Sequence, residues 1–191
     1  MRYFLSVSLT IALMSLSNLD LALSNPDLPN ARSDRSRSLP IPEPLRVPSN
    51  QRLLFAATAK GVQIYTCSAK TKSASDFAWT LQAPSADLFT DGVLLGKHYA
   101  GPTWELKSDG SKVVGVVSSK VNAPQKDAIP LLLLKAKPER KPGILGEVKW
   151  IQRLDTMGGK APLTGCDRSR QQAVVRVPYT ANYYFYHTAT P

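Results

Sequence analysis

Histidine and cysteine are scarce in this sequence of 191 residues, which has only two of each. Zinc and iron centres need clusters of such ligands, so we expect no metal site. The sequence also lacks the glycine-rich turn of dinucleotide-binding folds, the phosphate-binding loop of nucleotide hydrolases and the Gly-x-Ser-x-Gly motif of serine hydrolases. These absences exclude the standard forms of those enzyme classes, and we expect the protein to use no cofactor.

Long apolar runs are missing after the first 24 residues. Arg2 precedes the uncharged apolar stretch Phe4–Leu16, and Ala22-Leu23-Ser24 has the small-x-small pattern of a cleavage site. The stretch is shorter than the about 20 residues that cross a bilayer. We therefore interpret residues 1–24 as a signal peptide, the alternative being an uncleaved N-terminal anchor. A signal peptide predicts an exported protein, either periplasmic or extracellular.

Residues 25–49 are rich in proline, serine and arginine. Such a composition buries too little apolar surface to offset the entropy of ordering it. We expect a flexible segment, with a basic arm first and a polyproline II stretch from Leu39 to Pro48 on the domain surface. The arm would serve either as a tether to anionic polymers or lipid headgroups, or simply as a solvated linker.

The formal net charge is +10, so lysine and arginine clearly outnumber the acids. A basic protein favours partners of negative charge. The lysines are dispersed along expected strands and do not gather on one helix face, so we expect no nucleic-acid partner. The candidate partners are an anionic polysaccharide, a membrane surface or a small acidic ligand.

From about residue 50 onward, short β-rich runs alternate with turn signals, and no helical period is sustained. The runs 52–58 and 62–67 flank an Ala-Lys-Gly turn signal, and Asp109-Gly110 suits a two-residue hairpin turn with positive φ at both positions. The apolar run 128–136 is either a strand buried on both faces or a short helix. Residues 50–191 therefore predict an all-β fold, a single β-sandwich or barrel-like domain of about nine or ten short strands.

The two cysteines predict one structural link. In the oxidising environment of an exported protein, Cys67 and Cys166 should form a disulfide. It would close a loop of about 100 residues, which a chain-entropy model values at about 4–5 kcal/mol. The alternative is a free reactive thiol beside a histidine.

The stretch 96–111 is the first candidate site. His98 is a possible general base, with Glu105 or Asp109 assisting it, and Tyr99 lies next to it as a ligand contact. Strand alternation puts Trp104 and Glu105 on opposite faces, which argues against a pocket shared by those two. The simpler interpretation is a strand, a Gly-Pro corner and a hairpin.

The stretch 151–167 is the second candidate site. Arg153, followed by Gly158 and Gly159, would present a guanidinium and backbone amides to a carboxylate or sulfate. The simpler interpretation is a surface pair between Arg153 and Asp155. The aromatic run 183–187 alternates, with Tyr183 and Phe185 on one face, and we interpret it as core.

Six blocks in order carry a resemblance over residues 39–186: GVQIYTC, FAWTLQAPSADLF, GKHYAGPTWELKSDGS, AIPLLLL, WIQRLDTMGGKAPLTGCD and VPYTANYYFY. The chain resembles the exported-protein family known as domain of unknown function 3455. The resemblance implies export and a β-domain and supplies no reaction. Some fungal members are named malate dehydrogenase, but the parallel βαβ unit with a glycine-rich turn that such an enzyme needs is missing here. Leu131 departs from the family, which has an aromatic residue there.

Three functions follow as hypotheses. The first is a non-catalytic module that binds a carbohydrate or a small acidic ligand near His98, Tyr99, Arg153, Gly158 and Gly159. The second is a hydrolase or lyase with His98 as general base. The third is a structural envelope or matrix adhesion protein that uses the basic arm.

Overall fold

The computed structural model of the protein describes residues 40–70, 73–138 and 143–189. The expected signal peptide (residues 1–24) and residues 25–39 of the expected flexible segment lie outside the described residues. The described part is all-β, as the sequence predicts.

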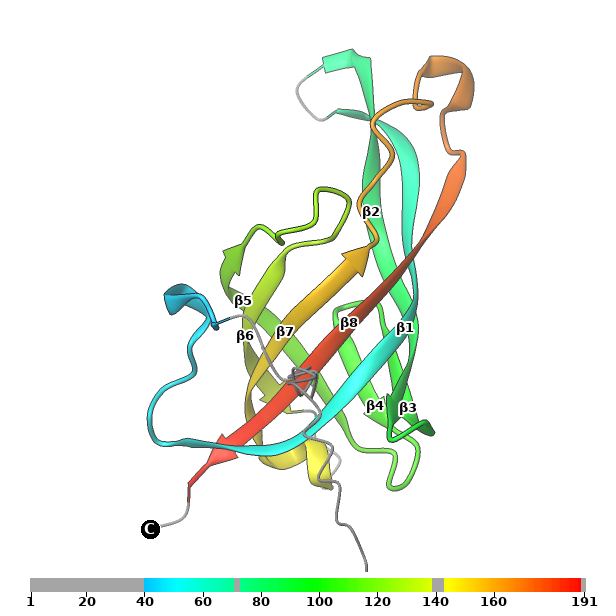
Figure 1. The fold of residues 1–191 in the computed structure, drawn as a ribbon. Coiled ribbons are helices and arrows are strands. Elements are labelled where there is room, and N and C mark those ends of the chain that lie inside the picture. Colours follow the sequence, from blue (N-terminus) through cyan, green and yellow to red (C-terminus); the bar gives the residue numbers. More distant parts are fainter. Residues whose placement is uncertain (1–39, 71–72, 139–142, 190–191) are drawn as a thin grey trace, which may run out of the picture. The chain divides into compact units, whose positions relative to one another are not determined.

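The strands of the described residues form one closed barrel. Each strand pairs antiparallel with its neighbours in the sequence, and the last strand pairs with the first (Figure 1). The closed ring decides between the two expected architectures in favour of a barrel. The strands are β1 (Gln51–Lys70), β2 (Ser73–Thr90), β3 (Val93–Tyr99), β4 (Thr103–Leu106), β5 (Lys112–Val121), β6 (Leu131–Pro138), β7 (Val148–Gly158) and β8 (Val174–Thr188).

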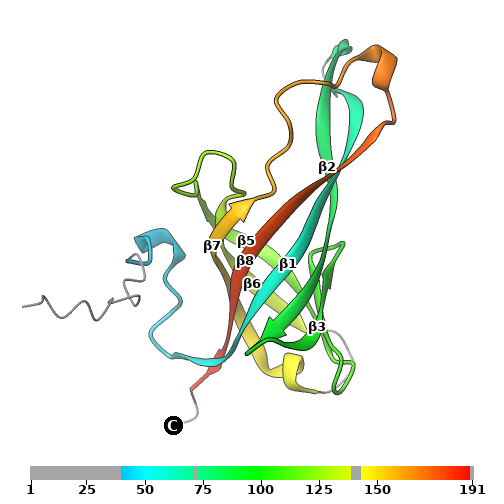
Figure 2. The same cartoon turned by 45° about the vertical axis from the view of Figure 1, so that its right-hand side comes forward.

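The strands are fewer and longer than the sequence predicts, because β1 runs through the expected Ala-Lys-Gly turn without a break. Gly61 does not turn the chain there. A side chain on Gly61 would place its Cβ 2.2 Å from the carbonyl oxygen of Ser85 on β2, so glycine allows the two strands to approach closely. Figure 2 shows β1 and β2 extending together past the end of the barrel.

The tight hairpin turn lies at Asp91-Gly92 and not at Asp109-Gly110. Asp91 and Gly92 have φ of 47° and 79° and join the paired residues at the ends of β2 and β3, as a type I′ turn requires. The turn between β4 and β5 is longer, and only Gly110 has a positive φ, of 64°. There the Asp109 carboxylate accepts a hydrogen bond from the amide of Ser111 at 2.9 Å, so the aspartate builds a side-chain turn.

The barrel interior holds the main core. Inward-facing side chains of all eight strands meet there, with Trp104 and Phe185 almost completely buried. Gly115 on β5 makes room for the indole, because a Cβ at that position would lie 2.8 Å from the Trp104 ring. Removing that space would force the largest core side chain to move.

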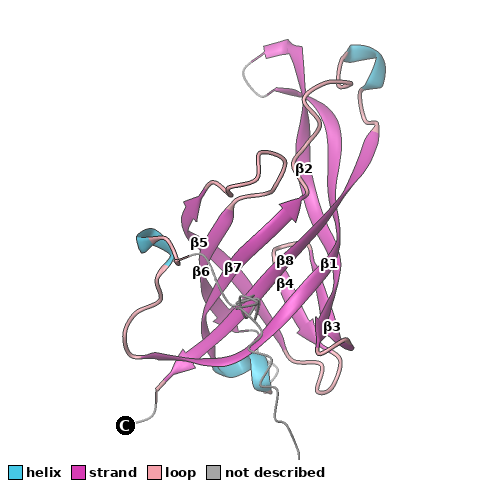
Figure 3. Cartoon of the chain, in the orientation of Figure 1, coloured by secondary structure: helices cyan, strands magenta, loops and turns pink. Residues whose placement is uncertain are grey.

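Short 3-10 helices interrupt the meander (Figure 3). Helix η2 (Ile144–Glu147) inserts Leu145, which is completely buried in the barrel core. Asp109 and Ser111 of the β4–β5 turn hold its first turn by accepting from the amides of Ile144 and Leu145 at 2.8 and 3.2 Å. No helix of the described residues is long and apolar enough to cross a membrane.

A second, smaller apolar cluster lies on the outer face of β6 and β7. Leu45 of helix η1 (Glu43–Leu45) packs there against Leu131 and Leu133 and has no exposed surface. The Gln152 side chain donates to the Leu45 carbonyl at 2.6 Å. Residues 40–49 thus contain a helical turn that packs on the barrel, because Leu45 covers an apolar patch that would otherwise face water. The cluster also explains why the apolar run at β6 is a strand buried on both faces.

Cys67 and Cys166 form the expected disulfide. It ties the far part of β1 to the loop before helix η3 (Arg168–Arg170). Two further contacts hold the connection between β7 and β8: the amide of Cys67 donates to the carbonyl of Ala173 at 2.8 Å, and the indole of Trp79 donates to the carbonyl of Thr164 at 2.9 Å.

Candidate functional site

A cavity of about 520 Å³ lies inside the barrel. Leu81, Val117 and Lys120 are exposed where they border it, so the cavity is open to solvent on that side. Each of the eight strands contributes to its wall, with Gln63, Pro84, His98, Trp104, Lys120, Leu132, Arg153 and Tyr183 in strand order.

The structure brings His98 and Arg153, the two main candidates of the sequence, into this one cavity. They come from β3 and β7, which lie across the barrel from each other, and only the closed ring lets both line the same cavity. The positive charge of Arg153 disfavours a proton on His98 and helps to lower its pKa.

His98 is fixed on three sides. Its Nδ1 donates to the carbonyl oxygen of Thr103 at 2.9 Å, its ring stacks on Trp104, and its other neighbour is the edge of Tyr183, with ring centroids 5.1 Å apart. Since a carbonyl only accepts, Nδ1 carries the proton of the neutral ring and Nε2 carries none. Only 2% of the side chain is exposed.

Burial lowers the pKa of His98 to about 3, and the positive charge of Arg153 acts in the same direction. The hydrogen bond to Thr103 opposes this shift and is outweighed. The ring is therefore neutral at physiological pH. A general base works best when its pKa lies near the working pH, so this histidine is poorly matched to that role.

Arg153 is half-buried and uses two donors on one backbone atom. Its Nε and one terminal nitrogen donate to the carbonyl oxygen of Pro130 at 3.0 and 2.8 Å. A guanidinium has five N–H donors, so three remain beyond this pair. The expected pair with Asp155 does not form: the Asp155 carboxylate accepts from Asn182 at 3.1 Å instead. Arg153 has no salt bridge within the described part of the chain.

Three buried side chains of the cavity wall carry polar atoms without a hydrogen-bond partner. They are the amide nitrogen of Gln63, the indole nitrogen of Trp104 and the hydroxyl of Tyr183, on side chains that are 2%, 1% and 1% exposed. The positive charge of Arg153 acts on the Tyr183 hydroxyl, but the two side chains make no hydrogen bond of normal geometry. Native proteins leave few such atoms, since each costs about 1–3 kcal/mol. Their grouping at one cavity marks it as a candidate binding site.

The charge of the cavity wall has one sign. Arg153 lies inside and Lys120 at the exposed border, and none of the described residues that line the cavity is acidic. No group of three or more His, Cys, Asp or Glu in the described ranges is arranged to hold a metal ion.

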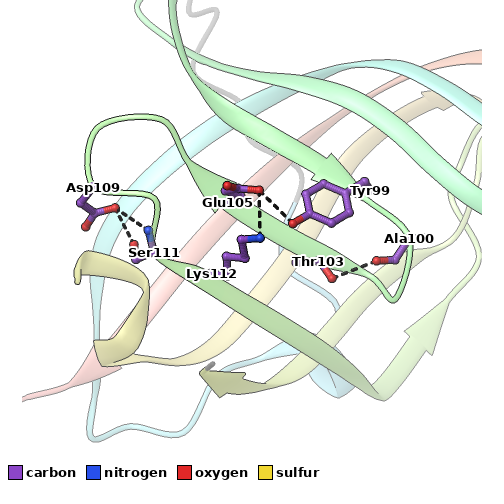
Figure 4. Close-up of polar contacts among 7 residues, drawn as sticks. All are labelled: Tyr99, Ala100, Thr103, Glu105, Asp109, Ser111 and Lys112. Atoms are coloured by element: carbon purple, nitrogen blue, oxygen red, sulfur yellow. Dashed lines mark hydrogen bonds and ion pairs between the residues drawn. The ribbon is translucent and has the colours of Figure 1, made fainter. Parts of the chain in front are cut away.

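Tyr99 and Glu105 point to the other side of the barrel wall from His98. The Tyr99 hydroxyl donates to the Glu105 carboxylate at 2.9 Å, and Lys112 lies 3.5 Å from the same oxygen (Figure 4). Burial, and next the hydrogen bond to Glu105, raise the pKa of Tyr99. Glu105 therefore belongs to an outer network, and neither it nor Tyr99 lines the cavity.

Asp109 is also separate from His98. It lies in the β4–β5 turn (Figure 4). His98 pairs with Trp104 of β4 and lies close to the β3–β4 turn, at the other end of that short strand. Hydrogen bonds from Ile144 and Ser111 lower the pKa of Asp109. The structure thus brings neither expected carboxylate to the histidine.

Gly158 and Gly159 lie behind the cavity wall. The Gly158 carbonyl accepts from the amide of Ile129 at 2.8 Å, and the Gly159 carbonyl accepts from the Tyr65 hydroxyl at 2.6 Å. A Cβ on Gly159 would lie 2.8 Å from Tyr179 and 3.2 Å from Gln63. With φ of 64° and 84°, the two glycines allow the turn that packs against Gln63.

The sequence did not predict what we call the donor wall, the cavity-lining side chains of Gln63, Trp104 and Tyr183 with their unpaired polar atoms. Tyr183 and Trp104 are core residues, and nothing in the local sequence shows that their polar atoms find no partner. Gln63 carried a usable signal, as a polar residue in the strand run 62–67. The inward face of that run is Gln63, Tyr65 and Cys67, which are buried, while the residues between them are half-buried.

The fold and the cavity define a class of protein: a disulfide-tied, closed β-barrel of up-and-down topology with an internal cavity. Barrels of eight strands are just wide enough to be filled by side chains or to hold one small ligand. The chain belongs to the family described as Protein of unknown function (DUF3455), whose model matches residues 48–187. No curated protein and no solved structure matches the chain.

Proposed function

We propose that the protein is a non-catalytic binding module that holds a carbohydrate or a small acidic ligand in the barrel cavity. One observation carries this proposal: three almost wholly buried side chains that line the cavity, those of Gln63, Trp104 and Tyr183, carry polar atoms without a hydrogen-bond partner. A ligand with hydrogen-bond acceptors would pair these atoms and remove their cost. The cavity volume of about 520 Å³ lies in the range that encloses small organic ligands.

The hypothesis of a hydrolase or lyase has less support. His98 has a pKa lowered to about 3, and its Nδ1 is bonded to a backbone carbonyl and not to a carboxylate. A neutral, stacked imidazole suits a wall of the site better than a proton-transfer group. Its unprotonated Nε2 would accept a hydrogen bond from a ligand.

Export to the periplasm or the outside of the cell is part of this proposal. The disulfide between Cys67 and Cys166 supports it, since such bonds persist in oxidising compartments. The net charge of +10 is compatible with acidic ligands and also with adhesion to an anionic envelope. The cavity favours ligand binding over adhesion as the function, because adhesion by charge alone needs no interior site.

The test is a thermal-shift screen with sugar fragments and small organic acids on the oxidised protein and two variants. Val117→Trp places a large ring at the exposed border of the cavity, where Val117 is 52% exposed. Val116→Trp is the matched control, since Val116 is 44% exposed and does not line the cavity. A true ligand at 100 times its Kd stabilises the protein by about 2.7 kcal/mol.

We expect at least one compound to raise the Tm of the wild type and of Val116→Trp but not of Val117→Trp. A screen without any stabilising compound contradicts the proposal. So does a compound that stabilises all three proteins equally, because it would bind elsewhere.

A further inference from the structure

We infer that the ligand of the cavity is an anionic amphiphile, with an oxyanion head paired to Arg153, Tyr183 and Gln63 and an apolar body in the rest of the cavity. This inference rests on the proposed function and chooses between its two ligand classes. It selects an acid with an apolar body over a sugar.

The head group follows from the kind of polar atoms that lack partners. The indole nitrogen of Trp104, the amide nitrogen of Gln63 and the guanidinium of Arg153 only donate hydrogen bonds, and the Tyr183 hydroxyl can donate. A sugar hydroxyl both donates and accepts, whereas this wall offers one imidazole acceptor, Nε2 of His98, against four donor groups, one of them a cation. An oxyanion only accepts, and several donors converging on one group match it.

The charge of the wall points the same way. Arg153 is half-buried, and its bonded partner is the neutral carbonyl of Pro130. Lys120 adds a second cation at the border, and the described lining residues contain no acid to balance the two. A buried or half-buried charge is stabilised by a partner of opposite sign, and the ligand would supply it.

The apolar body of the inferred ligand follows from the rest of the cavity wall. Apolar side chains form most of it, and they come from three strands and one turn: Leu81, Pro84, Pro102, Val117, Leu132 and Leu134. Leu81 and Val117 are 51% and 52% exposed, so apolar surface reaches the opening. Covering such surface with an apolar chain or ring is favourable at about 25 cal/mol per Å².

The experiment is a calorimetric titration of the full-length oxidised protein with five probes. Octanoate has both parts of the inferred ligand, octyl phosphate changes the kind of oxyanion, octanol keeps the body without charge, octylammonium reverses the charge, and acetate keeps the head alone. We expect octanoate or octyl phosphate to bind at least roughly tenfold more tightly than octanol, because their charged heads form hydrogen bonds stronger than those of a neutral hydroxyl. Octylammonium and acetate should give no measurable binding.

Two pairs of variants assign the effect to the donor wall. Tyr183→Phe removes one hydroxyl inside the cavity, and Tyr184→Phe makes the same change on the neighbouring residue of β8, which does not line it. Arg153→Gln removes the inner cation, and Arg168→Gln removes an exposed one with the same change of net charge. We expect Tyr183→Phe to weaken octanoate about tenfold and octanol less than twofold. Arg153→Gln should abolish the preference for octanoate, and both controls should behave as the wild type.

Three results would overturn the inference. One is octanol binding as tightly as octanoate. Another is an equal loss of both probes in Tyr183→Phe, which would make the residue merely structural. The third is no binding by any probe. If Arg153→Gln does not fold, the Tyr183 pair still decides the question. Val117→Trp separates this inference from the proposed function. If octanol and octanoate bind the wild type equally and Val117→Trp blocks both, the cavity binds ligands but the inferred oxyanion head is wrong. If Val117→Trp blocks neither probe, the probes bind elsewhere and the proposed function is contradicted as well.

Discussion

His98 and Trp104 lie opposite each other on β3 and β4, and their rings stack with centroids 4.4 Å apart and planes tilted by 13°. Tyr183 of β8 closes the third side, with its ring edge-on to both. The bond from His98 to the Thr103 carbonyl fixes the ring further. The histidine is thus part of a rigid aromatic wall of the cavity, and this packing accounts for its low pKa.

The first prediction concerns the effect of acid on stability. The pKa of His98 is about 3 in the folded protein and near 6.5 in the unfolded chain, so the unfolded chain takes up a proton first as the pH falls. The free energy of unfolding should therefore drop by about 1–2 kcal/mol between pH 6.5 and 5. Denaturant unfolding at several pH values measures it.

His98→Gln is the control for that measurement, because glutamine does not titrate. Its stability should lose this slope between pH 6.5 and 5. Asp109 and Asp167 have lowered pKa values, caused by hydrogen bonds, and they also destabilise the fold in acid. Their effect begins lower, near the pKa of about 4 of a free aspartate. An unchanged slope in His98→Gln would show that the pKa of His98 is not depressed.

The second prediction separates the outer carboxylate from the cavity. Glu105→Gln weakens a half-exposed network with Tyr99 and Lys112, so the free energy of unfolding should change by less than about 1 kcal/mol. Affinity for any cavity ligand should stay the same within twofold in calorimetry. A large loss of binding in this variant would place Glu105 in the site, contrary to its position on the outer face.

The third prediction concerns the anchor of residues 40–49. Leu45 is completely buried against the outer face of β6 and β7, and Leu45→Ala should cost about 2–4 kcal/mol of unfolding free energy. Ile41 lies in the same segment but is 39% exposed, so Ile41→Ala should change stability by less than about 1 kcal/mol. Equal, small effects of the two substitutions would mean that the segment does not pack on the barrel.

The fourth prediction concerns the disulfide. Replacing both Cys67 and Cys166 by alanine frees a loop with a sequence separation of 99 residues. The loss should be about 4–5 kcal/mol in the chain-entropy model, read from the midpoint of urea unfolding. Wild-type protein in reductant should show a similar loss, and the unreduced protein should not react with a thiol reagent. A midpoint that does not move would contradict the stabilising role.

The sequence predicted much of the fold because its strands alternate. The two-residue period of β8 correctly put Tyr183 and Phe185 on the buried face, and that of β4 did the same for Trp104 and Leu106. Bulges broke the rule elsewhere. Strict alternation groups Val148 with Trp150, yet a register shift between them turns Val148 into the barrel core, and Trp150 packs outside.

The candidate site was only half accessible to such reasoning. His98 and Arg153 stood out by residue type, but their meeting depends on the closure of the ring. The sequence suggested Glu105 and Asp109 as partners of His98 because they are near it in the chain. Glu105 instead faces the outside of the barrel, because adjacent residues of a strand point to opposite faces, and Asp109 lies in the β4–β5 turn. Gln63 becomes important only because the three-dimensional packing leaves its amide unpaired.

The most direct test of the account observes the Trp104 indole N–H by proton–nitrogen NMR while octanoate is added. We expect this resonance to shift and to saturate with the calorimetric Kd, because the Trp104 indole lines the cavity and its nitrogen has no partner within the protein. The indole of Trp79, already bonded to the Thr164 carbonyl, should stay in place and serves as the internal control. Saturable binding of octanoate with no change at Trp104 would contradict a ligand in the barrel cavity.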